Sequence, residues 1–463
     1  MQMSLYTREA LSREARITLA LALPLIVGQL SQMGMGFIDT VMAGRLGAAA
    51  LSAIGLGGAL WSVPMVFSLG VLMALPALIS ERKGAKDLSQ VREIFQQALY
   101  FALALAVVLF VLANTLSLWL LDLMRVKAEL KPDAIAYVRA VSLGAPALCV
   151  FIALRSLSDG LSFTKPSMYF GLFGLLLNAP MNWIFIYGKF GVPAFGAIGT
   201  GYATAVVTWL QCIGMLLFVL YAKRYAGYAL FKRFAAPRLR PIGRIARVGL
   251  PVGMAMLMEV SLFAAVALLM GGFSVLAVSA HQVAINFASL TFMVPLGIAL
   301  AVTVRVGDAF GSRNINEVRL RGVVGILVAL LGQAFAISLM VFFPRAVAGI
   351  YTQDPAVIAL AAQMLILAGI FQLSDGLQVA CAGALRGLQD TRAVLLITIA
   401  AYWLLGFPLA WLFGFKFNLG PLGLWYGLIA GLSFAAVALL WRWRRQTRSM
   451  RRLEEAALAV SAG

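Results

Sequence analysis

Three carboxylates lie deep inside long apolar stretches of this 463-residue chain: Asp39, Glu259 and Asp375. Asp39 lies in a stretch that runs from about residue 17 to residue 44. An ionised carboxylate in hydrocarbon is unfavourable by roughly 3 kcal/mol or more, so it is retained where it faces a cavity, has a partner, or takes up a proton or a cation. These residues are therefore the candidate positions for binding a proton or a small cation.

The composition places these acids in a membrane protein. The chain is 62% hydrophobic and 12% charged, with a mean hydropathy of +0.93, whereas soluble domains carry about 25% charged residues. The period-2 alternation of a membrane barrel is absent from the sequence. Runs of about 20 apolar residues predict an all-α protein with twelve membrane helices, at about 15–41, 50–79, 94–121, 134–154, 167–188, 196–222, 246–271, 276–304, 320–343, 355–380, 393–415 and 420–441.

The net charge of +19 follows the predicted topology. With the N-terminus in the cytoplasm, 29 of the 37 Lys and Arg residues fall on the cytoplasmic side and 7 on the other, with Arg139 inside a helix. This asymmetry is typical of the positive-inside rule. It predicts a multi-pass protein of the inner (plasma) membrane with both termini in the cytoplasm and basic loops next to lipid headgroups. No recognised nucleic-acid motif accompanies the charge, so no nucleic-acid partner is expected.

The chain repeats itself with an offset of 227 residues. Leu23-Pro24 falls on Leu250-Pro251, and Gly160-Leu161 falls on Gly387-Leu388. Each half would contain six helices, and because this number is even, the second half begins on the same side of the membrane as the first. The repeat therefore predicts two pseudo-symmetric lobes related by an axis along the membrane normal. We expect an N-lobe at 1–222, a basic cytoplasmic linker at 223–245, a C-lobe at 246–441 and a cytoplasmic tail at 442–463.

None of the three acids is copied in the other half, because their repeat equivalents are Val266, Gln32 and Leu148. They are therefore not framework residues of the duplicated fold. The amide-bearing residues predicted to support them are Asn178 and Asn182, four apart on one helical face, for Asp39, and Gln282, Asn286 and Gln378 for the other two. Such groups suit either a proton or Na⁺, which favours an ion-coupled transporter.

Other chemistry has little support in the sequence. His281, the single histidine, could relay protons near neutral pH, but a neutral, hydrogen-bonded core histidine is the commoner case. The Walker A, HExxH, CxxC and GxSxG patterns are absent. We expect no catalytic residue, no structural metal and no cofactor. The alternative function is a flippase for a lipid-linked precursor, which would need a strongly cationic cavity.

Several motifs resemble the multidrug and toxic compound extrusion (MATE) family, in particular its bacterial NorM-type branch. They lie, in the family's order, at residues 35–44, 159–160, 164–166, 177–185, 280–287, 374–375 and 383–387. The resemblance implies a monomer with two six-helix lobes around a central cleft. It also implies export of cationic and lipophilic drugs, driven by inward movement of H⁺ or Na⁺.

The same resemblance assigns site residues. Asp39 matches the family's N-lobe carboxylate and Asn178 its amide neighbour, while Glu259 and Asp375 match the C-lobe pair, so Na⁺ would bind at one of these two places. Asn182 stands where some members have Asp, and Phe371 stands where some Na⁺-using relatives have Tyr. Both departures favour H⁺ as the coupling ion.

Overall fold

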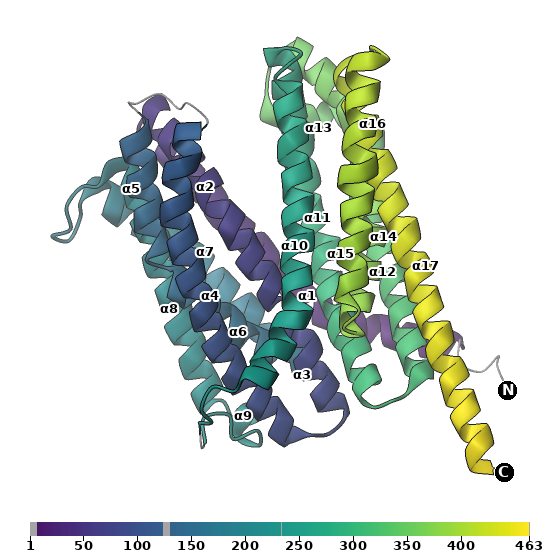
Figure 1. The fold of residues 1–463 in the computed structure, drawn as a ribbon. Coiled ribbons are helices and arrows are strands. Elements are labelled where there is room, and N and C mark those ends of the chain that lie inside the picture. The colour runs from purple at the N-terminus through teal and green to yellow at the C-terminus, as the bar shows by residue number, and fades with distance from the viewer. Residues whose placement is uncertain (1–6, 124–129, 233, 463) are drawn as a thin grey trace. The chain divides into compact units, whose positions relative to one another are not determined.

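The computed structural model describes residues 7–123, 130–232 and 234–462, and this part of the chain is helical, with no strand. The first half of the chain contains α1 (Arg8–Gly44), α2 (Ala48–Leu72), α3 (Leu75–Gly84), α4 (Leu88–Leu123), α5 (Lys131–Ser142), α6 (Ala145–Gly160), α7 (Lys165–Tyr187), η1 (Gly196–Ile198), α8 (Gly199–Tyr221) and α9 (Lys223–Ala226). The second half contains α10 (Leu239–Met270), α11 (Val275–Gly311), α12 (Ile315–Phe342), α13 (Pro344–Tyr351), α14 (Pro355–Gly387), α15 (Thr391–Ile399), η2 (Ala400–Gly406), α16 (Phe407–Trp411), η3 (Leu412–Lys416) and α17 (Gly420–Ala462) (Figure 1).

The number of membrane spans agrees with the sequence. Among the described residues, 11 helices are long and apolar enough to cross a membrane, and the pair α5 and α6, bent by 43°, makes a twelfth. Helices α2 and α3 belong to one span, as do the segments from Thr391 to Lys416. The prediction of an all-α integral membrane protein with twelve spans is confirmed.

The stretch predicted as a cytoplasmic tail, 442–463, begins as part of the last helix, because α17 continues without a break to Ala462. Trp443 and Thr447 are only 2% and 4% exposed, and Trp443 packs over Gly322 on α12 so closely that a Cβ there would lie 2.1 Å from the indole ring. Counting apolar residues ends the helix at the first arginines, whereas an amphipathic helix continues past them.

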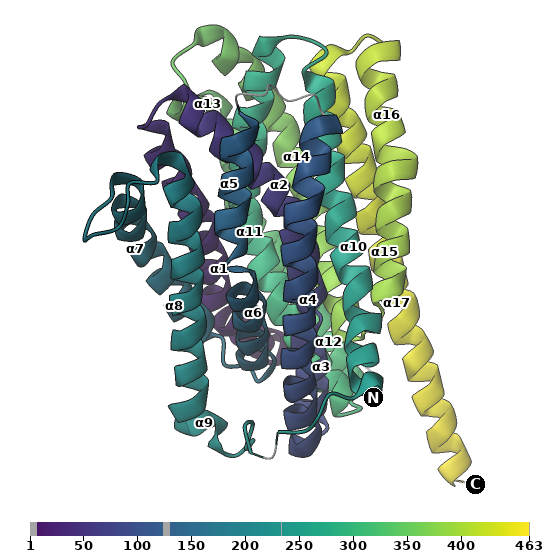
Figure 2. The same ribbon diagram turned by 60° about the vertical axis from the view of Figure 1, so that its left-hand side comes forward.

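The basic linker is docked on α4. The side chain of Gln96 donates to the carbonyl of Leu230 (2.8 Å) and accepts from the amide of Ala235 (3.1 Å). Gln97 pairs in the same way with two backbone groups further along. Figure 2 shows this stretch passing from α9 to α10 near the beginning of α4. Two buried glutamines thus satisfy the polar backbone of the linker.

The chain forms two compact units, and each takes a half-helix from the other half of the sequence. One unit is Val27–Gly253, and the other joins the residues up to Ile26 with Met254–Gly463. The divisions are 227 residues apart and follow Pro24 and Pro251 by two residues. Both divisions between the units therefore lie within helices, α1 and α10. The sequence had instead predicted the boundary between the lobes in the linker at 223–245.

Close packing explains this exchange. In the unit that ends at Gly463, a Cβ at Gly297 would lie 2.5 Å from the side chain of Ile26, so α11 directly contacts the first half of α1. In the other unit, a Cβ at Gly249 would lie 2.4 Å from the carbonyl of Val71, so the first half of α10 lies against α2. Glycines at these contacts allow helix backbones to approach closely.

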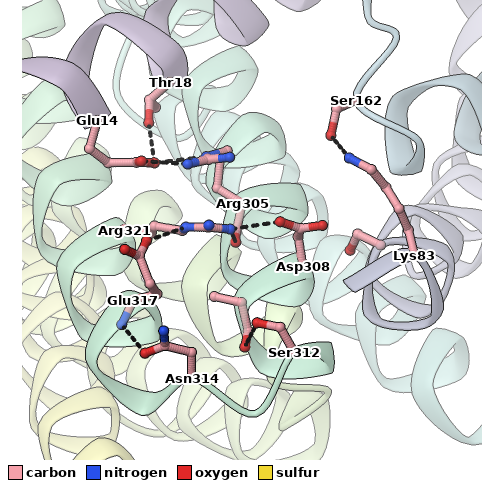
Figure 3. Close-up of polar contacts among 12 residues, drawn as sticks. Glu14, Thr18, Lys83, Ser162, Arg305, Asp308, Ser312, Asn314, Glu317 and Arg321 are labelled. Atoms are coloured by element: carbon pink, nitrogen blue, oxygen red, sulfur yellow. Dashed lines mark hydrogen bonds and ion pairs between the residues drawn. The ribbon is translucent and has the colours of Figure 1, made fainter. Parts of the chain in front are cut away.

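An ion-pair network fixes the first half of α1 within its unit (Figure 3). Glu14, 3% exposed, accepts two hydrogen bonds from the guanidinium of Arg305 on α11, one of them 2.7 Å from Nε. Arg321 on α12 contacts Asp308 (2.8 Å) and Glu317 (3.0 Å). The network joins α1, α11 and α12 through charges that are largely shielded from solvent.

We predict that Glu14→Gln destabilises the protein strongly, because it leaves the half-buried Arg305 without its carboxylate. Breaking a buried ion pair from one side typically costs about 3–5 kcal/mol. Thermal unfolding in detergent measures the effect. The matched control is Glu455→Gln, which breaks the more exposed ion pair with Arg451. An exposed ion pair contributes about 1 kcal/mol or less to the free energy of unfolding, so this variant should unfold close to the native temperature. Equal melting temperatures for Glu14→Gln and the native protein would contradict the prediction.

Candidate functional site

Asp39 is held by neutral donors from two other helices. Its Oδ1 accepts hydrogen bonds from the amide nitrogens of Asn178 (3.0 Å) and Asn182 (2.6 Å) on α7. Its Oδ2 accepts from the hydroxyl of Thr204 on α8 (3.0 Å). The Asp39 side chain is half-buried and both asparagines are fully buried. Three donors thus replace part of the hydration that a carboxylate loses on leaving water.

Helix spacing explains why these residues meet. Helices α1 and α7 approach closely where Gly28 faces Gly171, since a Cβ at Gly171 would lie 3.1 Å from the Gly28 Cα. Asp39 and Asn182 each follow their glycine by eleven residues. Eleven residues are about three turns, so they return to the same face. The close glycine contact therefore aligns the carboxylate with the amide three turns later.

Glu259 and Asp375 form the second site, in the unit that contains α10 to α17. Asp375 is 3% exposed, and its Oδ1 has no hydrogen-bond partner within the described residues. The two carboxylates interact electrostatically with each other and with the hydroxyl of Tyr402 in η2. Gln378, one turn after Asp375 on α14, donates to the same hydroxyl. Residues from α10, α14 and η2 thus surround two acids with unused hydrogen-bonding capacity.

A buried arginine accompanies this pair. Arg386 on α14 is 7% exposed, and its charge interacts with that of Glu259. It follows Asp375 by eleven residues on the same face of α14, and side chains on a helix lean toward its N-terminus. Its Nη1 has no partner among the described residues. Arg386 therefore offsets part of the negative charge at this site.

Other residues proposed from the sequence do not join the acids. Gln282 and Asn286 are exposed on α11, and Asn286 accepts a long hydrogen bond of 3.5 Å from Tyr351. His281 is 1% exposed, packs edge-on against Trp425 (ring centroids 5.6 Å apart), and its Nδ1 has no partner among the described residues. Within the described part of the chain, no hydrogen bond or ion pair connects these residues to Glu259 or Asp375.

Sequence reasoning missed Thr204, Tyr402 and Arg386. Thr204 and Tyr402 carry ordinary membrane-helix residue types and give no signal of their own. Arg386 was counted among the loop residues that follow a helix expected at 355–380, whereas α14 runs to Gly387 and includes it. Two signals were available for Arg386: its eleven-residue spacing from Asp375 and its place in the motif at residues 383–387.

Phe371 lies one turn before Asp375 and packs against Phe263 and Trp425, with ring centroids 5.8 and 6.0 Å apart. At 2% exposure it belongs to the aromatic core and offers no oxygen to a cation. Among the described residues, the unpaired oxygens near the acids include Oδ1 of Asp375, Oδ1 of Asn182 and the amide oxygens of Gln333, Gln372 and Gln378.

Comparison with known proteins identifies relatives along nearly the whole chain. The MatE family model matches residues 24–184 and 251–412, and the two matches begin 227 residues apart, the offset of the repeat. The multidrug resistance protein NorM of Vibrio vulnificus is 42% identical, with 92% of this chain and 94% of that protein covered. PmpM of Pseudomonas aeruginosa is 40% identical over 96% of this chain and 94% of its own length.

Solved structures have the same fold. An outward-facing multidrug resistance MATE transporter has a TM-score of 0.86 at 23% identity, with 95% of this chain and 97% of that chain covered. The eukaryotic MATE transporter AtDTX14 has a TM-score of 0.84 at 21% identity, covering 96% and 99%.

We predict that Glu259 and Arg386 are energetically coupled. Arg386→Gln leaves the two acids without their buried counter-charge and should lower the melting temperature. Adding Glu259→Gln to Arg386→Gln should recover part of the loss, with a coupling free energy of about 0.5–3 kcal/mol. Thermal unfolding of the single and double variants measures this. Strictly additive effects would show that the two charges act independently.

Proposed function

The chain belongs to the MatE family, in its bacterial NorM-type branch, and on this premise we propose that it exports several kinds of drug from the cytoplasm in exchange for protons. The relatives at about 40% identity are named multidrug resistance proteins. The exported compounds are cationic or lipophilic, and Asp39, Glu259 and Asp375 carry the coupling ion. In this proposal the protein lies in the inner membrane as a monomer, with both termini in the cytoplasm, and it needs no cofactor.

The observation that carries the proposal is the set of donors around Asp39. Asn178, Asn182 and Thr204 all direct hydrogens at its two oxygens, an arrangement that suits the ionised form. A proton on either oxygen neutralises the carboxylate and adds an O–H donor, so the charge-assisted bonds from these donors weaken and the one from Thr204 can reverse its direction. Because the donors belong to α7 and α8 and the acid to α1, protonation changes the contacts that join three helices.

This change links the ion to conformation. A ligand shifts an equilibrium between two states only by its differential affinity for them. A protonated Asp39 accepts weaker bonds from these donors than the ionised form does in the described state, so proton binding favours a different arrangement of α1 against α7 and α8. Drug binding and proton binding then influence each other through the same acid.

The atoms near Asp39 support H⁺ over Na⁺. A proton needs one oxygen, whereas a hard cation needs several converging oxygens. Asn178 and Asn182 present nitrogens to the carboxylate, and both amides would have to turn around to coordinate Na⁺. Of the amide oxygens in this set, that of Asn178 accepts from Asn182 (3.1 Å), and only that of Asn182 is unpaired within the described residues.

The flippase alternative has weaker support. A site for a pyrophosphate-bearing lipid needs an excess of positive charge. Arg386 is a buried cation, but it accompanies two acids, Glu259 and Asp375. The charges therefore suit a cation better than an anion.

We predict that Asp39→Asn, Glu259→Gln and Asp375→Asn each reduce drug export while the protein still folds. Coupling free energies are typically 1–3 kcal/mol, so the initial rate of ethidium efflux from proteoliposomes should fall by about fivefold or more. Thr208→Val is the matched control, because the Thr208 hydroxyl bonds a carbonyl of its own helix (2.7 Å). Undiminished efflux by all three acid variants would refute the carboxylate mechanism.

We also predict that a pH gradient alone drives efflux. Vesicles with an imposed H⁺ gradient and no Na⁺ should export ethidium or a fluoroquinolone, because one proton on Asp39 is enough to change its hydrogen bonds. Collapsing the gradient with a protonophore is the control. Efflux that requires a Na⁺ gradient at clamped pH would instead identify Na⁺ as the coupling ion.

A further inference from the structure

A groove of about 420 Å³ lies on the unit that contains α10 to α17, away from the acids described above. Its walls are one face of α12 and one face of α17, with Leu377 of α14 contributing between them. The lining residues are Arg319, Val323, Ile326, Leu327, Leu330, Leu377, Leu440, Trp443, Arg444, Thr447 and Arg448. The groove is therefore apolar along most of its length and strongly basic at one end.

The three arginines of the groove have no counter-charge. Arg444 and Arg448 are exposed and Arg319 is half-buried. In the described part of the chain, none of the three guanidinium groups forms a hydrogen bond or an ion pair with an acid. Arg442 and Arg451, on the same stretch of α17, are by contrast paired with Asp390 and Glu455. The basic end of the groove thus offers unused donors for an anion.

The dimensions fit one lipid leaflet. Arg319 and Leu330 are eleven residues apart on α12, which is about 16 Å along the helix. The hydrocarbon core of a membrane is about 30 Å thick, so one leaflet is about 15 Å. The arginines precede the apolar core of α12 and follow that of α17, the ends that the charge distribution assigns to the cytoplasm. The groove therefore extends from the headgroup level to the middle of the membrane.

We propose that this groove binds an anionic phospholipid of the cytoplasmic leaflet. Its phosphate accepts hydrogen bonds from Arg319, Arg444 and Arg448, since planar guanidinium groups match phosphate oxygens in pairs. An acyl chain lies along Val323, Leu327 and Leu330. Basic pockets between membrane helices on this side suit such headgroups. A cationic drug is excluded by the same arginines, so this is not a drug site.

Trp443 gives the site its shape. It is 2% exposed and packs over Gly322, one turn after Arg319. This contact brings the arginine-bearing segment of α17 against α12. The continuation of α17 past residue 442 is therefore part of the lipid site.

The test measures lipid retention by the full-length protein in neutral detergent, using native mass spectrometry. Phosphatidylglycerol is the anionic probe and phosphatidylcholine with the same acyl chains is the control. We expect the native protein to retain phosphatidylglycerol preferentially. The triple variant Arg319→Gln/Arg444→Gln/Arg448→Gln should bind it at least about tenfold more weakly, because each basic residue near the headgroup contributes about 1 kcal/mol.

The matched control is Arg13→Gln/Arg240→Gln/Arg452→Gln, which removes three exposed arginines outside the groove and should leave retention unchanged. Leu330→Trp, which fills the apolar part and keeps every charge, should also weaken binding. Equal retention of both lipids, equal loss in the two triple variants, or binding of glycerol 3-phosphate as tight as that of the lipid would each overturn the proposal. Drug efflux is not the readout, so the result stands apart from the proposed antiport.

Discussion

Placing charge inside a membrane is the constraint on which this structure depends. Asp39 is tolerated because neutral donors from two neighbouring helices replace water. Glu259 and Asp375 are tolerated in another way, because Glu259 lies near the buried cation Arg386 and Asp375 lies near Glu259. With all groups ionised, each set carries one net negative charge. None of the three acids has an acid at its repeat-equivalent position in the other half. Each site nevertheless lacks one positive charge to be neutral.

The sequence identified the candidate site residues whose types are rare in membrane-spanning helices. Asp39 was conspicuous within an apolar run, and Asn178 and Asn182 were recognisable as a pair four residues apart. Thr204 was not, because a threonine hydroxyl in a membrane helix commonly bonds its own backbone, as that of Thr208 does. The burial of Arg386 was not recognised, because it depends on the last turns of α14 and on packing between distant segments.

The fold shows the same division between local and long-range information. Apolar runs predicted twelve spans, because each run is a pattern of consecutive residues. The 227-residue offset predicted a duplicated architecture, because matching residues recur at a constant spacing. The docked linker depends on Gln96 and Gln97 reaching backbone groups more than 130 residues later. The extension of α17 depends on the contact between Trp443 and Gly322. Neither contact leaves a periodic pattern in the sequence.

The exchanged half-helices have an evolutionary consequence. Neither residues 1–238 nor residues 239–463 contain a complete unit, because each segment lends its first half-helix to the other. An ancestor of one repeat would have closed its core by trading that half-helix with an identical chain, as in a swapped homodimer. In one polypeptide that carries both repeats, the same exchange takes place within a single molecule, and the two copies can hold different acids, Asp39 in one and Glu259 and Asp375 in the other.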